Sequence, residues 1–234
     1  MRRVVRAFWG PRPEPVETLA GRWRQTLEGV TELLPSAVSP VRGGWRQVHS
    51  SGPDTACTPE DLTAVLLVAQ GAEAWSDLTG TGLRLTCTGD GGWAVELSGV
   101  AGGTPQFLLQ SLVMTIEAPD GAVVPESELL AVLASVWEPD FGDVSDDGIL
   151  DALEDDAGFT VGDPVVGRFG YLCAARAVLV PTGLGTVRQD LPDGGALLHI
   201  AASGEIDTVV RVYERLRDAG ALVPLPRPLN RPTL

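Results

Sequence analysis

The chain has 234 residues, of which 44% are hydrophobic, and this composition excludes a disordered protein and allows a sizeable core. The formal net charge is −14, and all 17 cationic side chains are arginine. Residues 47–165 hold 21 acidic side chains against the single cation Arg84, which disfavours nucleic acid as a partner and favours a basic protein or cations.

The first half of the chain predicts strands alternating with two helices. The helix over 13–35 has apolar residues at three- and four-residue spacing and ends at Pro35, and the helix over 58–74 has Thr58 as its N-cap. Alternating residues on both sides of a glycine-rich turn predict a β-hairpin over 83–99. Further strands are expected over 2–10, 44–50 and 107–119, the last of them central in the sheet.

The second half predicts a helix over 125–140, an acidic segment over 138–163, strands over 167–180 and 194–203, and a helix over 205–220. A proline-rich tail occupies 224–234. This order mixes hairpins with crossovers, so we expect one α+β domain over 1–234 with a mixed, largely antiparallel sheet and helices packed mainly on one side. Trp23 and Leu27 should pack on the first strand.

No apolar run reaches the roughly 18 residues that a membrane span requires. The apolar part of the N-terminal sequence is too short and too interrupted for a secretory signal, so we expect a cytoplasmic protein. The three cysteines are far apart and only two histidines accompany them, so neither a disulfide framework nor a transition-metal site is expected.

Residues 143–154 have the spacing of a calcium loop, with oxygen-bearing side chains at Asp143, Ser145, Asp147, Asp151 and Glu154. A short acidic helix accounts for the same residue pattern, because Ser145 is a good N-cap and the apolar residues that follow form one face. Proline and glycine also interrupt the helix that would have to enter the loop. We therefore predict a short helix beginning near Ser145 without bound calcium, and keep a calcium- or cation-stabilised binding module as the alternative.

Such a helix would carry Asp147, Asp151 and Asp155 on one stripe, where like charges repel each other slightly. An arrangement that weakens the isolated fold and is relieved by cationic side chains suggests a partner surface. The acidic residues assigned to this surface are Asp140, Asp143, Asp146, Asp147, Asp151, Glu154, Asp155 and Asp156.

Enzyme signatures are weak in this sequence. It contains no nucleophile elbow, phosphate-binding loop or zinc-protease motif. His49 and His199 stand in strand-like or apolar surroundings and are interpreted as structural. We expect a protein that is not an enzyme and has no cofactor, although an enzyme of unrecognised class remains a third reading.

Several short motifs, in order, resemble the immunity protein 52 family of bacterial polymorphic-toxin systems. They are "FWGPRPEP" at 8–15, "LAGRW" at 19–23, "VWEPDFGDV" at 136–144, "GRFGYL" at 167–172 and "LPDGGALLHIA" at 191–201. The residues matching the family motifs are Trp9, Gly10, Pro11, Arg12, Trp137 and Pro139, which could form either the fold or the interface. The chain departs from the family's pattern at 173–180, where "CAARAVLV" stands in place of a longer, aromatic-rich closing strand.

The resemblance implies a cytoplasmic, stoichiometric inhibitor that binds and neutralises a cognate toxin, whose domain is expected to be a restriction-endonuclease-like nuclease. It supplies no catalytic residues. The implied partner agrees with the charge distribution, because a nuclease needs a basic surface for phosphate and an inhibitor can occupy that surface with carboxylates.

Overall fold

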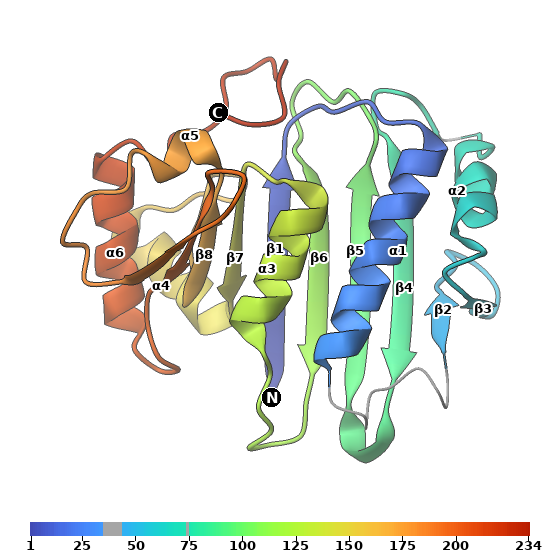
Figure 1. The fold of residues 1–234 in the computed structure, drawn as a ribbon, viewed down its shortest axis with the longest axis horizontal. Coiled ribbons are helices and arrows are strands. Elements are labelled where there is room, and N and C mark those ends of the chain that lie inside the picture. Colours follow the sequence, from blue (N-terminus) through green and yellow to red (C-terminus); the bar gives the residue numbers. More distant parts are fainter. Residues whose placement is uncertain (35–43, 74) are drawn as a thin grey trace.

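The computed structural model describes residues 1–34, 44–73 and 75–234; Pro35 and Ala74 lie outside them. Ten described strands form one sheet in the order β3-β2-β4-β5-β6-β1-β7-β8-β10-β9, and every pairing is antiparallel (Figure 1). The strands are β1 (Arg2–Trp9), β2 (Trp45–Gln47), β3 (Thr55–Cys57), β4 (Thr81–Thr88), β5 (Ala94–Ala101), β6 (Gln110–Glu117), β7 (Phe141–Ser145), β8 (Phe169–Leu172), β9 (Val187–Asp190) and β10 (Ala196–His199). The described helices are α1 (Val16–Leu33), α2 (Leu62–Gln70), α3 (Glu126–Trp137), α4 (Asp147–Ala157), α5 (Ala174–Ala177) and α6 (Ile206–Asp218), with a short 3₁₀ turn, η2, at Asp90–Gly92.

Helices α1 and α3 lie side by side across one face of the sheet, and α2 packs against α1 and β4 (Figure 1). Trp137 of α3 stacks on Trp9 of β1 with ring centroids 5.3 Å apart, and Trp23 of α1 meets Trp137 edge-on at 5.5 Å. A Cβ added at Gly99 of β5 would stand 3.3 Å from the Trp23 ring. Trp23 therefore contacts β5 and Trp137, while Trp137 of α3 stacks directly on the first strand; Trp23 and Leu27 share one hydrophobic cluster with Val5 and Ala7 of β1.

Helices α4 and α6 pack against each other on the opposite face, over the C-terminal strands (Figure 1). The side chains of β7 alternate between the two faces, because Val144 belongs to the core under α1 and α3 whereas Phe141 belongs to the core under α4 and α6. One continuous sheet thus carries both hydrophobic clusters.

The α+β class and the largely antiparallel sheet are confirmed, although the sheet is not mixed, since none of the described strands pairs in parallel; α1, α2 and α3 share one face, and α4 and α6 lie on the other. The long strand predicted over 167–180 is wrong: β8 ends at Leu172 and the four-residue helix α5 follows. Strands β3, β7 and β9 were not predicted. Among the described residues, none of the helices combines the length and the apolar character needed to cross a bilayer.

Candidate functional site

The acidic segment folds as a buried strand, β7, followed by the helix α4. Asp146 is the N-cap of this helix, and its Oδ1 accepts a hydrogen bond from the Ile149 N–H at 3.1 Å. The predicted short helix is therefore present, but its cap is one residue later than predicted. Ser145 instead lies inside β7 and donates a hydrogen bond to Asp143.

Asp140 lies inside the protein and cannot belong to a partner surface. Its side chain and that of Arg176 are both 0% exposed, and they form two hydrogen bonds of 2.9 and 2.6 Å. The Cys173 thiol and the Leu234 N–H also donate to this carboxylate, at 3.3 and 2.9 Å. Asp140 is thus a structural anchor that joins the start of β7 to α5 and to the C-terminal tail, and we remove it from the predicted surface.

Asp143 is also fully buried, so its assignment to the partner surface was wrong as well. It points from β7 toward the neighbouring strand β1, where Arg6 donates to its two oxygens at 3.0 and 2.7 Å. Burial alone would lower the pKa of Arg6, but the charge of Asp143 and its hydrogen bond outweigh this and raise the pKa above its ordinary value. The pair holds β1 and β7 in register.

The next acidic residues are compensated by the N-terminal arginines. Asp146 is 3.7 Å from Arg3, and Asp147 is 3.3 Å from Arg2 although the Asp147 side chain is 81% exposed. The antiparallel pairing of β1 with β7 brings the basic start of the chain to the start of α4. Charge counted along the sequence therefore overstates the negative field at this end of the segment.

The uncompensated charge lies farther along α4. Asp151, Glu154, Asp155 and Asp156 are exposed, and in the described part of the chain none of them has an ion-pair or hydrogen-bond partner. The buried residues Ile149, Leu153 and Ala157 fix the opposite side of the helix against the core. Of the residues assigned to the partner surface, the structure thus brings together Asp147, Asp151, Glu154, Asp155 and Asp156 on the solvent side of one helix.

A calcium loop is not formed by residues 143–154. The first three positions belong to β7, with Asp143 engaged by Arg6, and the residues from Asp147 onward are helical. The oxygens of positions 1 and 5 are a buried and an exposed carboxylate, respectively, so they do not face a common centre. Among the described residues, no group of three or more histidine, cysteine or acidic side chains could hold a metal ion.

The motif Trp9-Gly10-Pro11-Arg12 lies at a crowded junction. The Gly10 N–H donates to the Pro232 carbonyl at 2.8 Å, and a Cβ at Gly10 would stand 2.1 Å from the Arg231 oxygen. Gln110 donates to the Gly10 carbonyl at 2.7 Å. Only glycine fits at this position, because the tail passes directly over its backbone, so this part of the motif forms the fold.

The side chain of Arg12 stacks over the Trp9 ring at 5.3 Å and lies 3.6 Å from Glu14. Burial lowers the pKa of Arg12 from its ordinary value. Arg22 pairs with Glu14 at 2.9 Å and with Glu138 at 3.1 Å. These residues join the end of β1 to the end of α3, where Pro139 is buried and Glu138 adopts a left-handed conformation with φ of 44°.

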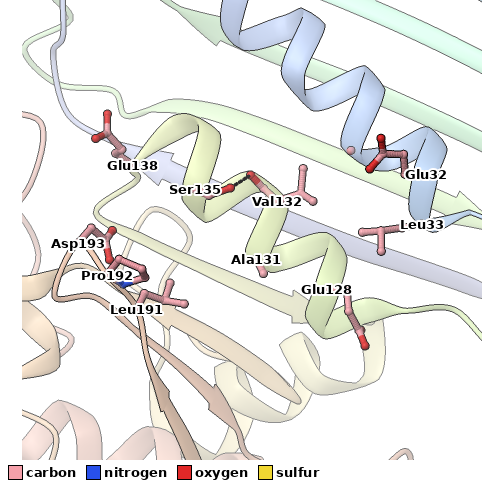
Figure 2. Close-up of a pocket in the computed structure, with 11 residues that line it drawn as sticks. Glu32, Leu33, Glu128, Ala131, Val132, Ser135, Glu138, Leu191, Pro192 and Asp193 are labelled. Atoms are coloured by element: carbon pink, nitrogen blue, oxygen red, sulfur yellow. Dashed lines mark hydrogen bonds between the residues drawn. The ribbon is translucent and has the colours of Figure 1, made fainter.

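An acid-rimmed groove that sequence reasoning missed lies on the face that carries α1 and α3 (Figure 2). Its volume is about 580 Å³, and it lies between α1, α3 and the turn that joins β9 to β10. Its apolar lining consists of Leu33, Ala131, Val132, Leu191 and Pro192, and its acidic residues are Glu32, Glu128, Glu138 and Asp193. These positions come from three separate segments, so no single sequence window contains the pattern.

Candidate catalytic groups occupy structural positions. His199 stacks on Phe169 with centroids 4.6 Å apart, and His49 hydrogen-bonds Thr55 at 2.9 Å. The three cysteines are buried, and burial raises the pKa of each thiol, so none is activated as a nucleophile.

The structural role of Arg176 was not predicted from the sequence. Its position in the apolar run "CAARAVLV" was the available signal, because a cation buried among apolar residues needs a buried partner.

Two surfaces therefore remain as candidates for binding, the exposed acidic side of α4 and the acid-rimmed groove on the other face of the sheet. Both present carboxylates to solvent, and the groove adds apolar area. Comparison with protein-family models finds no match to this chain, and a search of curated proteins finds no similar sequence.

Proposed function

We propose that the protein is a stoichiometric inhibitor that binds a basic partner protein through the exposed side of α4. The observation that carries this proposal is the set of four unpaired carboxylates of Asp151, Glu154, Asp155 and Asp156 on one eleven-residue helix. Neighbouring like charges on a helix repel, and a cationic partner relieves that repulsion on binding.

The partner class follows from charge together with the resemblance to immunity protein 52. A nuclease toxin has a basic surface that binds phosphate, and a carboxylate-bearing helix can occupy the same surface. The protein would then act in the bacterial cytoplasm as the antidote of a polymorphic toxin. The fixed packing of α4 on α6 supports this role, because a rigid helix presents its charges without an ordering cost.

The test uses the toxin encoded beside this protein and two variants with equal changes in charge. Asp151→Lys, Glu154→Lys and Asp155→Lys together reverse the α4 surface, whereas Glu17→Lys, Glu28→Lys and Glu117→Lys reverse three exposed charges on other elements. Association rates are measured at about 20 mM and about 200 mM NaCl, because the Debye length falls from roughly 20 Å to roughly 7 Å over this range. Asp147 is left in place, since a lysine there would face Arg2.

The α4 variant should associate at least roughly tenfold more slowly at low salt and lose most of its salt dependence, and it should fail to protect cells from the toxin. The control variant should show a smaller loss, because its charges lie apart. Equal losses of association rate in both variants would mean that only the net charge of the protein matters. Unchanged rates in both variants would mean that α4 is a solvated helix without a role in binding.

A further inference from the structure

The groove on the α1–α3 face has an elongated shape. Its floor is the outward stripe of α3 formed by Glu128, Ala131, Val132, Ser135 and Glu138, and α1 borders it on one side (Figure 2). A second hollow of about 300 Å³ shares Glu128 and Ala131 and extends the depression toward β9 and β10. Gly29 lets α1 come close to α3 at this side of the groove, because a Cβ there would stand 2.9 Å from Val132.

The groove is apolar in the middle and negative at both ends. Figure 2 shows Glu138 and Asp193 toward one end and Glu32 and Glu128 toward the other. No cationic side chain is among the described residues that line it. Glu138 is the only one of the four carboxylates paired with a cation in the described structure, and its side chain is still 63% exposed.

The spacing of the charges limits what can fill the groove. Glu128 and Glu138 are ten residues apart in sequence on or next to α3, which corresponds to about 15 Å along a helix axis. A small molecule that fixes its orientation needs polar groups converging on one point, and these carboxylates are at opposite ends. An amphipathic helix can place apolar side chains in the middle and cations at both ends at this spacing.

We propose that this groove binds an amphipathic, cationic helix of a partner protein. The apolar face of that helix would cover Ala131, Val132 and Leu191, and Lys or Arg side chains one at each end would meet the two pairs of carboxylates. A second copy of this chain fits less well, because the chain carries a net charge of −14 and the apolar face of its arginine-bearing helix α6 is already buried. The inference stands apart from the role proposed for α4, which lies on the opposite face of the sheet.

The probe is a fluorescein-labelled synthetic peptide designed as an 18-residue helix, with four leucines on one face and two lysines eleven residues apart, which places the lysines about 16 Å apart on the same side of the helix. A matched peptide carries glutamates in place of the two lysines. Binding is measured by fluorescence anisotropy with the full chain. One variant, Ser135→Trp, fills the floor of the groove from an exposed position, and another, Glu32→Gln with Glu128→Gln, removes two rim charges.

The control for charge is Glu17→Gln with Glu117→Gln, which removes two exposed carboxylates outside the groove. The lysine peptide should bind, and the glutamate peptide should bind at least about tenfold more weakly. Ser135→Trp and Glu32→Gln/Glu128→Gln should each weaken binding about fivefold or more, and the control less than about twofold. Circular dichroism checks that each variant is folded.

Three peptide-binding results would each overturn the proposal: no binding of the lysine peptide, equal weakening by rim and control variants, or no effect of Ser135→Trp. A concentration-dependent dimer that Ser135→Trp abolishes in sedimentation would also overturn it, because the groove would then hold a second copy of the chain. Toxin association remains a separate readout, so failure of the groove leaves the test of α4 intact.

Discussion

At the scale of single residues, burial divides the acidic side chains into two classes with different roles, one structural and one exposed to solvent. Asp140 and Asp143 are fully buried and paired with arginines, whereas Asp151 and Asp155 face solvent without partners in the described structure. A buried ion pair costs desolvation on both sides, so it adds little net stability while intact. Losing one partner strongly destabilises the protein, because the remaining charge is then buried without compensation.

Arg176→Met should therefore destabilise the protein strongly. Among the described residues, it leaves the buried Asp140 carboxylate with only the Cys173 thiol and the Leu234 N–H as donors. We expect a loss of about 3–5 kcal/mol in the free energy of unfolding. The measurement is urea denaturation. Arg84→Met, which breaks an exposed pair with Glu96 at 2.7 Å, serves as the control and should cost under about 1 kcal/mol. Equal costs for the two variants would refute the structural role of the Asp140–Arg176 pair.

At the scale of elements, the helices with clear apolar spacing were predictable, whereas three short strands, β3, β7 and β9, were not. The expected helix over 13–35 is observed as α1, because its apolar residues repeat on one face and this signal is local. Strand β7 was hidden because "FGDVS" contains an aspartate and a glycine, which disfavour a strand. Its buried Asp143 is compensated mainly by Arg6 of β1, and such long-range pairing leaves no mark in a local sequence window.

The N-terminus of α4 offers a test at this scale. Asp146→Ala removes the capping hydrogen bond to the Ile149 N–H and should lower the free energy of unfolding by about 0.5–2 kcal/mol. Asp156→Ala, in the last turn of the same helix, should leave stability unchanged or raise it slightly, because the helix dipole disfavours a negative charge there. Urea midpoints of both variants provide the comparison. A larger loss for Asp156→Ala than for Asp146→Ala would contradict this assignment of the cap.

At the scale of the whole molecule, the fold redistributes the charge that the sequence separates. Residues 1–46 are net positive and residues 47–165 strongly negative, and the pairing of β1 with β7 brings the two together at the start of α4. The acidic surface predicted from the sequence therefore begins at Asp147, and its carboxylates lack a partner in the described structure only from Asp151 onward. The groove needed α1, α3 and the β9–β10 turn in their final positions, so no sequence pattern could have indicated it.

The remaining imbalance predicts that salt stabilises the free protein. A net charge of −14 repels itself across the molecule, and the carboxylates of α4 lie closer together than the Debye length of about 8–10 Å at physiological ionic strength. Raising NaCl from about 20 mM to about 500 mM should increase Tm by roughly 2–4 °C, which corresponds to about 1 kcal/mol for a chain of this size. Sodium chloride is preferred to sulfate because sulfate strengthens apolar burial by itself.

The variant Asp151→Asn/Glu154→Gln/Asp155→Asn should start from a higher Tm and gain less from salt. The control variant Glu17→Gln/Glu28→Gln/Glu117→Gln should behave more like the parent protein, because its charges lie on separate elements. A Tm that falls with added salt would show that salt weakens ion pairs such as Arg2–Asp147 and Arg3–Asp146 more than it relieves the repulsion between carboxylates. In that case, repulsion on α4 would not favour the binding of a cationic partner.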